Sequence, residues 1–344
     1  MDAIVFAVFA YLLGAVITLW VAGALYFDTA QSAWWGWLLV LVWLSGVIAL
    51  FAWTAQLSQA LFVLFVLFAA YFWWWRKLQP SHNRNWDPNF AQLPAIGIQG
   101  DELSVCNVRN TEYRTITDYT VRYETRHFRL SQMRRVDVLI LYWGSKYMSH
   151  PMFVFDFGPD GHLCISLEVR YRVGQKYNFL KSLFRQQELM YVVSDERDAI
   201  LRRTKCLAGH DMYLYLIQGN PLEMRQFFFE YANRINKLVD TPRWYHGITA
   251  NCTTGIYAQG RGRMEWDWRM LFNGALDRML YDRKRLDPSL PFEQLKERSW
   301  VNEIANRAPV ESFGDYLREH LPGYRRILDE NKDDLTIRRK GVDD

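Results

Sequence analysis

The sequence predicts an α+β domain that follows a bundle of three transmembrane helices and precedes a helical C-terminal extension. Three observations support this fold class. Residues 1–75 contain no Lys or Arg, and Asp2 and Asp28 are their only acidic residues. Short apolar or alternating runs, which are typical of strands, follow between residues 119 and 217. After residue 266 the spacing of the apolar residues becomes helical.

Three apolar spans account for the first part of the chain, at roughly residues 4–27, 33–53 and 57–75. Each has about the 20 residues that are needed to cross the hydrocarbon core of a bilayer. Arg76 and Lys77 mark the end of the third span. The start has no basic region of the kind that opens a signal peptide. Tryptophans at the expected interfaces resemble aromatic belts: Trp34, Trp35, Trp37, Trp73, Trp74 and Trp75.

The orientation in the membrane depends on the number of spans. With the amino terminus in the cytoplasm, three spans place the rest of the chain outside the cytoplasm. Two spans, with residues 33–75 partly re-entrant, would reverse this orientation. Arg76 and Lys77 also argue weakly for the reverse, although long domains cross a membrane largely regardless of local charge.

The chain divides into four parts by composition. Residues 1–77 form the membrane anchor, and residues 78–100, rich in Pro, Asn and Gly, are typical of a linker. Residues 101–265 form the α+β domain, and residues 266–344 form the helical extension. The net charge is +4, and this small, dispersed excess does not indicate a nucleic-acid partner.

The α+β domain is expected to contain several strands and one long helix. The sequence GPDG at residues 158–161 predicts a hairpin turn. The helix spans about 221–239, with Asn220 as its N-cap, Pro221 at its first position and Glu223 in a capping box. The strands are expected at 119–130, 135–143, 152–157, 163–173, 189–193 and 212–217, and the later helices at 266–283, 292–305 and 311–320.

Cys252 is the first candidate for a chemical role. It lies at the predicted start of a helix with Asn251 as the N-cap, where the backbone amides of Thr253 and Thr254 would stabilise a thiolate or an oxyanion. The alternative is an ordinary small buried side chain. The four cysteines form no CxxC pair and no Cys/His metal spacing, so we expect neither a metal site nor a cofactor.

A cysteine nucleophile requires a base, and His150 is the best candidate because it opens the strand of the predicted hairpin. If the turn has a bulge at Gly161, His150 pairs with Arg170, and Glu168 lies diagonally beside it on the same face. Glu168 could then orient the imidazole. A two-residue turn would move Glu168 to the opposite face. Asp156 stays on the His150 face for either turn and is the second candidate for the orienting acid.

Other residues are candidates for supporting the site. Tyr245 belongs to the segment that leads to Cys252, and His246 in the same segment is an alternative base. The charged sequence DERDAILRRT at 195–204 is typical of a solvated helix face. The alternative is that Glu196 and Arg197 support the site through a buried ion pair.

Several ordered segments resemble the Lnb family, which takes its name from lipoprotein N-acyltransferases and is defined by the Lnb N-terminal periplasmic domain. The resemblance covers roughly residues 106–324. It rests on the segments NVRNTEYRTITDYTVRYETRHFRL, SHPMFVFDF, ISLEVRYRVGQKYNFLKSLFRQQELMYVVSDERDAILRRT, YLYLI, PRWYHGITANCTT and SFGDYLREHLPGY.

This resemblance implies a circularly permuted papain-like domain, in which the histidine strand precedes the nucleophile helix, as His150 precedes Cys252. It also implies that Cys252 takes an acyl chain from a membrane phospholipid as a thioester, with His150 as the base. The acceptor would be the N-terminal amine of a lipid-modified bacterial lipoprotein. The implied location is the inner membrane, with the catalytic domain on the periplasmic side. The alternatives are a membrane-anchored cysteine hydrolase acting on cell-wall peptides and an inactive binding domain.

Overall fold

A computed structural model describes residues 3–30, 32–207, 209–252, 267, 269 and 273–324. The chain forms two compact units. The first contains Met1–Arg84 together with Gln175–Leu189 and Pro242–Gly247, and the second contains the rest of the chain. The α+β class, the three apolar N-terminal helices and the helical C-terminal region are confirmed. The circularly permuted papain-like arrangement remains a prediction.

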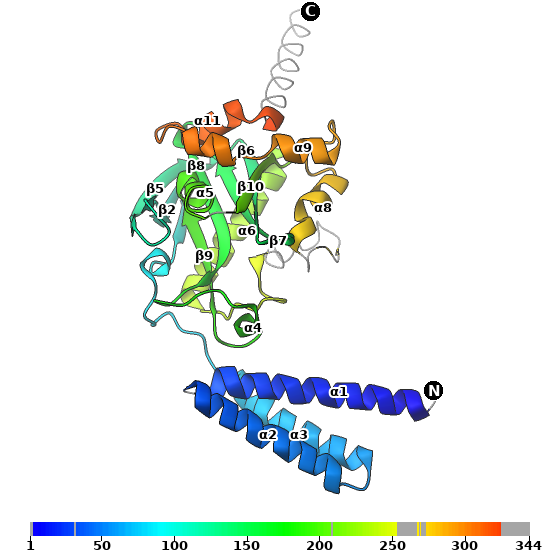
Figure 1. Ribbon diagram of the computed structural model, residues 1–344. Coiled ribbons are helices and arrows are strands. Elements are labelled where there is room, and N and C mark those ends of the chain that lie inside the picture. Colours follow the sequence, from blue (N-terminus) through cyan, green and yellow to red (C-terminus); the bar gives the residue numbers. More distant parts are fainter. Residues whose placement is uncertain are drawn as a thin grey trace, which may run out of the picture. The chain divides into compact units, whose positions relative to one another are not determined.

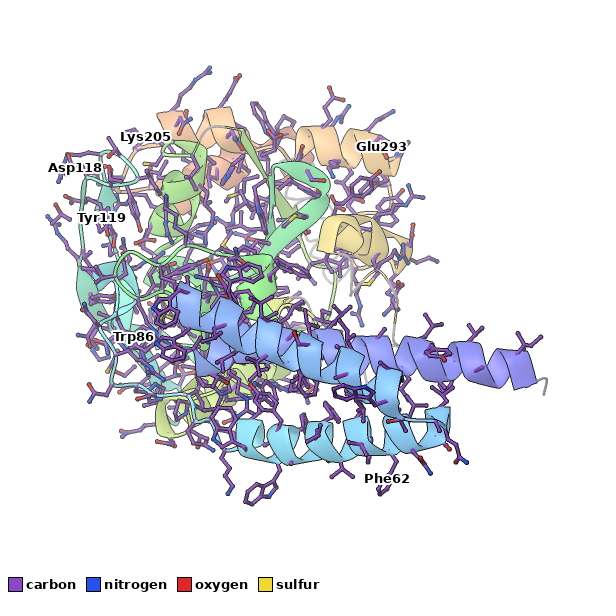
Figure 2. The ribbon with its side chains drawn as sticks, turned by 60° about the horizontal axis from the view of Figure 1, so that its bottom comes forward. Phe62, Trp86, Asp118, Tyr119, Lys205 and Glu293 are labelled. Atoms are coloured by element: carbon purple, nitrogen blue, oxygen red, sulfur yellow. The ribbon has the colours of Figure 1, made fainter. Side chains whose placement is uncertain are left out.

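The first unit is built on three long apolar helices (Figure 1). They are α1 (Ala3–Ala24), which continues as a π-helix over Leu25–Thr29, α2 (Ala33–Trp53) and α3 (Leu57–Arg76). All three are long and apolar enough to cross a membrane, as the sequence predicted. Their outer surfaces carry exposed apolar side chains. Phe62, on the outer side of α3 (Figure 2), is 68% exposed, as a lipid-facing side chain would be.

The second unit is organised around an eight-stranded, largely antiparallel sheet. The strand order is β1-β2-β9-β8-β7-β6-β10, with β5 also pairing with β2. The strands are β1 (Ala95–Gln99), β2 (Glu102–Arg109), β5 (Tyr123–Arg129), β6 (Arg135–Trp143), β7 (Ser145–Asp156), β8 (His162–Arg170), β9 (Glu188–Ser194) and β10 (His210–Leu216), and a separate pair is formed by β3 (Glu112–Tyr113) and β4 (Tyr119–Thr120).

Three strands, β1, β2 and the two-residue β3, were not predicted. In β2 the alternation of apolar residues is interrupted, because Asn107 has a positive φ of 58° and the register with β5 shifts between Val105 and Val108. Such a bulge places two residues opposite one and breaks the period of two by which a strand is recognised. β1 is short and lies within residues 78–100, the Pro- and Asn-rich range that was predicted to be a linker, so composition concealed this strand.

Helices cover both faces of the sheet (Figure 1). On one face α5 (Glu196–Thr204), α10 (Asn302–Arg307) and α11 (Phe313–His320) pack on Leu139, Met152 and Met212. On the other face the aromatic residues of α6 (Pro221–Asp240) pack on Phe153 and Phe155. Successive residues of a strand point to opposite faces, so the even-numbered residues of β7 face α5.

The predicted N-cap and first residue of α6 are confirmed, and the reciprocal bond of the predicted capping box, from Glu223 back to the Asn220 amide, stays a prediction. The side chain of Asn220 accepts a hydrogen bond from the Glu223 backbone amide at 2.9 Å, and Pro221 is the first helical residue. The carboxylate of Glu223 binds Arg285 at 3.1 Å. Asn220 thus makes the predicted cap, and Glu223 links the helix start to the C-terminal region.

The predicted single helix at 292–305 is wrong. The chain forms α9 (Phe292–Arg298) and then α10, and the residues between them pair with the edge of β10. The amide of Leu214 donates to the carbonyl of Ser299 at 2.9 Å, and the amide of Val301 donates to the carbonyl of Met212 at 3.0 Å. These hydrogen bonds require extended backbone, which interrupts the helix.

The remaining C-terminal predictions concern residues 266–283 and 311–320. Within the described part of the first range, a 3₁₀ turn (Asn273–Ala275) leads into α8 (Leu276–Asp282). The last predicted helix is confirmed as α11. α8, α9, α10 and α11 therefore make the described part of the extension helical.

A buried ion cluster joins α11 to the sheet. Arg318 binds Asp137 of β6 at 2.5 Å and Glu196 of α5 at 3.0 Å, and the hydroxyl of Tyr324 donates to Asp137 at 2.7 Å. Arg318 and Asp137 are almost fully buried, with 1% and 0% exposure. Charges in such surroundings depend on their partners, because water does not replace a missing one.

We predict that Arg318→Leu strongly destabilises the protein. It leaves the carboxylates of Asp137 and Glu196 buried without their cation, which costs about 3–5 kcal/mol. The apparent melting temperature in detergent, followed by intrinsic fluorescence, should fall by about 5 °C or more. The control is Arg307→Leu, whose side chain is 74% exposed and which should melt near the wild type. Equal melting temperatures of the two variants would contradict this role of the cluster.

Candidate active site

His150 and Glu168 lie opposite each other on adjacent strands, in a register that differs from both predicted ones. The loop spans residues 157–161, with a 3₁₀ turn at Gly158–Asp160, so Asp156 pairs with His162 and Met152 with Ser166. Continued by two residues, the same register places His150 directly opposite Glu168. Both predicted turns were too short. The longer loop brings the two side chains closer than the predicted diagonal arrangement.

The carboxylate of Glu168 is the centre of the site. Its Oε1 atom contacts Nε2 of His150 at 3.0 Å, and it accepts hydrogen bonds from the Ser166 hydroxyl at 2.9 Å and from the Arg203 guanidinium at 2.7 Å. Burial alone would raise the pKa of Glu168. The charges of His150 and Arg203 outweigh burial and hold this pKa well below its usual range. Glu168 is therefore an ionised acceptor at neutral pH.

The His150 imidazole is held as a cation by its neighbours. Burial alone would lower its pKa, but the Glu168 carboxylate and a hydrogen bond with Cys252 outweigh burial and raise the pKa of His150 to about 9. The ring of Trp143 lies edge-on to the imidazole, with 6.3 Å between the ring centroids. His150 is therefore protonated below about pH 9 and loses its charge only as the pH rises through that value.

Cys252 completes the arrangement as a buried thiol, with 6% exposure, that is hydrogen-bonded to His150. Because Nε2 of His150 faces Glu168, Nδ1 is the ring nitrogen available to the sulfur. A thiol, an imidazole and a carboxylate in this order can form a thiolate–imidazolium pair and support nucleophilic attack on a carbonyl carbon.

Cys252 has helical backbone, Asn251 directly precedes it, and the structure describes this segment only as far as Cys252. Asn251 is buried, with 3% exposure, directly before the candidate nucleophile. Thr253 and Thr254 lie outside the described residues, so the predicted contribution of their amides to an oxyanion site remains a prediction.

Asp156, the second candidate for the acid that orients His150, lies away from the candidate active site. It lies six residues along β7 from His150, a separation of about 20 Å in a strand. Its carboxylate binds Arg135 at 2.5 Å and accepts the amide of Gly158 at 2.7 Å. Asp156 and His150 share a face of the sheet, as predicted, but six residues of β7 separate them.

The predicted pair of Glu196 and Arg197 is also not formed. Glu196 is buried, with 2% exposure, and binds Arg318. Arg197 donates to the side chain of Asn110 at 2.6 Å. The charged segment does support the site through a buried ion pair, but the residue that forms this pair with Glu168 is Arg203, about two helical turns after Glu196. Consecutive residues of a helix point in different directions, which is why the two neighbours diverge.

The last predicted supporting residue, Tyr245, belongs to the first compact unit. It is buried, and its backbone amide donates to the carbonyl of Gln187 at 2.8 Å. His246, the alternative base, lies in the same segment, where burial lowers the pKa of its imidazole.

Sequence reasoning missed Ser166 and Arg203. A signal for Ser166 was present, because residues two apart on a strand share a face, and Ser166 is two residues from Glu168. Arg203 was concealed by the dense charge of its segment, which resembles a solvent-exposed helix. Its side chain is nevertheless buried, with 5% exposure for the residue. A buried carboxylate on the facing strand requires a cation, and that requirement could have identified Arg203.

The remaining cysteines show no competing chemistry. All four are free thiols, and burial in the core beneath α5 raises the pKa of Cys164. Within the part of the chain that the structure describes, no group of three or more His, Cys, Asp or Glu side chains could hold a metal ion.

The fold and the site together define a membrane-anchored α+β protein with a thiol, an imidazole and a carboxylate in line. Residues 119–263 match the family model described as the Lnb N-terminal periplasmic domain, so this part of the chain is similar to the Lnb family. The matched range includes His150, Glu168 and Cys252. No curated protein and no solved structure matches the chain. This match indicates an enzyme related to lipoprotein modification, in a membrane protein with a periplasmic domain.

We predict that Glu168→Gln abolishes the high pKa of His150. Without the carboxylate charge, burial dominates and the pKa should fall from about 9 to below the ordinary value of about 6.5. The measurement is a pH titration of the histidine resonances by NMR, with the His150 signal assigned by its loss in His150→Gln. The charged form would then disappear below about pH 6.5 instead of near pH 9. An unchanged titration would show that Glu168 does not control His150.

Arg203 is predicted to position Glu168 and, through it, the thiol. Arg203→Met removes a charged hydrogen bond and should slow alkylation of Cys252 by iodoacetamide at pH 7 by about tenfold to a hundredfold. Arg203→Lys should restore part of the rate. The matched control is Arg202→Met, because Arg202 lies over the Phe90 ring and should stay within about twofold of the wild type. Equal slowing by Arg202→Met would contradict a specific role for Arg203.

Proposed function

We propose that this protein is a membrane-bound acyltransferase. It would move a fatty acyl chain from a phospholipid, through a thioester on Cys252, to the N-terminal amine of lipid-modified bacterial lipoproteins. The observation that supports this most strongly is the hydrogen-bonded line from Cys252 through His150 to Glu168, in a membrane-anchored chain that is similar to the Lnb family. In this proposal Cys252 is the nucleophile, His150 the acid and base, and Glu168 the orienting residue.

The first half of the reaction forms the thioester. The Cys252 thiolate attacks the carbonyl carbon of the phospholipid ester, a C–S bond forms, and the ester C–O bond breaks. The His150 imidazolium gives its proton to the departing alkoxide, which leaves as the hydroxyl of a lysophospholipid. A His150 that is protonated below about pH 9 is suited to this step, because the proton is already in place.

The second half transfers the acyl chain to the amine. The amine nitrogen attacks the thioester carbon and a C–N bond forms, while the neutral His150 takes a proton from that nitrogen. The C–S bond then breaks, which releases the Cys252 thiolate and the amide product. The charge on His150 is then restored beside Glu168. The sum is one ester and one amine converted into one amide and one alcohol, with no further reactant.

The membrane anchor supports this assignment of substrates. The proposed donor and acceptor are both lipids that remain in a bilayer, so anchoring keeps them at a high effective concentration near the enzyme. Three spans with the amino terminus inside would place the catalytic domain, residues 101–265, on the periplasmic side of the inner membrane. The proposal includes the circularly permuted papain-like order, with the histidine strand before the nucleophile helix.

The test is intact mass spectrometry of the full-length protein incubated with phospholipid vesicles. Wild type should gain a hydroxylamine-sensitive acyl mass, and Cys252→Ala should not, because only a thiol forms a thioester. His150→Ala should acylate at least about a hundredfold more slowly. Addition of a diacylated lipopeptide should then clear the adduct and produce an acylated peptide amine.

The control for specificity is Cys164→Ala, which alters a buried core thiol and should leave the adduct unchanged. A wild type that gains no acyl mass, with or without lipopeptide, would contradict the acyltransferase. Release of free fatty acid or cleavage of cell-wall peptides by the same Cys252 would indicate the hydrolase instead.

A further inference from the structure

One exposed stretch of the first unit has the composition of a membrane-surface element. Residues 176–181, of sequence KYNFLK, lead into the short helix α4 (Phe179–Ser182) and include its first three residues. Tyr177, Phe179 and Leu180 are 38%, 50% and 59% exposed. Lys176 and Lys181 flank them, and residues 169–187 contain no acidic side chain. Apolar side chains between lysines are typical of segments that lie in the headgroup region of a bilayer.

This stretch is attached to the transmembrane helices by an aromatic contact. Phe184, two residues after the end of α4, stacks on Phe27 with 5.1 Å between the ring centroids. The ring also fills the space beside Gly23, where an added Cβ would lie 2.2 Å from it. A glycine in α1 therefore allows the ring to lie directly against the helix backbone.

Polar contacts attach the same segment to the ends of the helices. Gln186 donates to Asp28 at 2.7 Å, and Asp28 also accepts the indole N–H of Trp75 at 2.7 Å. The guanidinium of Arg185 lies 4.0 Å from the Trp75 ring and donates to the carbonyl of Arg76 at 3.0 Å. These contacts join the segment to the end of α1 and to the end of α3.

That end of the helices has the features of a membrane interface. The C-terminal ends of α1 and α3 meet there, and α2 begins there with Trp34 and Trp35. The ammonium group of Lys77 lies 3.2 Å above the Trp73 ring. Tryptophans and basic residues at a helix end are typical of the water–lipid boundary. Phe184 and Arg185 therefore hold residues 176–181 beside that boundary.

We propose that residues 176–181 form a second membrane contact, which inserts Tyr177, Phe179 and Leu180 into the headgroup region of the leaflet in which α3 ends. Lys176 and Lys181 bind the anionic headgroups of that leaflet. Two arguments select the bilayer as the partner. The segment is continuous with the interfacial end of the transmembrane helices, and its charge is opposite to that of anionic lipids. The inference is independent of the proposed acyl transfer.

The experiment measures the depth of residue 180 in the bilayer. A genetically encoded fluorescent amino acid replaces Leu180 in the full-length protein, one copy per lipid nanodisc that contains phosphatidylglycerol. Quenching by lipids spin-labelled near the headgroup should exceed quenching by deeply labelled lipids by about threefold. Replacement of either Lys176 or Lys181 by serine should lower the ratio of membrane-inserted to free segment about fivefold in anionic nanodiscs. In neutral nanodiscs the same replacements should change this ratio little.

Two control positions have a similar exposure, Leu222 at 66% and Val310 at 62%. Leu222 belongs to α6 and Val310 lies between α10 and α11, and these helices cover opposite faces of the sheet. Quenching at residue 180 no greater than at both controls would overturn the proposal. Protection of residue 180 that requires two copies per disc, or an added lipopeptide, would also overturn it in favour of a protein or peptide partner.

Discussion

A buried, ionised carboxylate at Glu168 is the constraint that organises the second unit. A charge removed from water needs several partners, and three side chains from three segments meet at one oxygen of this residue. Ser166 comes from the same strand, His150 from the neighbouring strand and Arg203 from α5. The position of β7 on β8 and the position of α5 on the sheet are therefore both linked to the same atom. A shift of either element would leave a buried charge without its partner.

The helix α5 forms similar buried ion pairs with other elements of the second unit. Besides Arg203, its residue Asp198 binds Arg109 of β2 at 2.7 Å, and its residue Glu196 binds Arg318 of α11. A single short helix thus has ion pairs with β8, β2 and α11. Such pairs add little net stability compared with apolar packing, but loss of one partner is strongly unfavourable. Their consequence is a defined geometry, which a catalytic imidazole needs more than it needs additional stability.

Features that depend on local signals were predictable from the sequence, and features that depend on distant partners were not. The apolar spans, the Asn220 cap and the presence of a turn at GPDG are each encoded in one continuous stretch of sequence. The length of the loop at Gly158–Asp160 changed the register, because one or two residues decide which side chains face each other across a hairpin. The burial of Arg203 depends on a carboxylate far away in the sequence, so charge density alone indicated a solvated helix. The break between α9 and α10 likewise depends on β10.

The pairing of residues 299–301 with β10 has a consequence for association between molecules. β10 is the last strand of the sheet, and an open edge of this kind presents unpaired N–H and C=O groups on which strands of other molecules can assemble. Ser299 accepts a backbone hydrogen bond from Leu214, and Val301 donates one to Met212. The side chain of Asn302 accepts a hydrogen bond from the amide of Met212 at 2.9 Å. The C-terminal extension thereby covers this edge of the sheet. A shortened chain that ends before Ser299 would keep the three candidate catalytic residues but expose a template for aggregation.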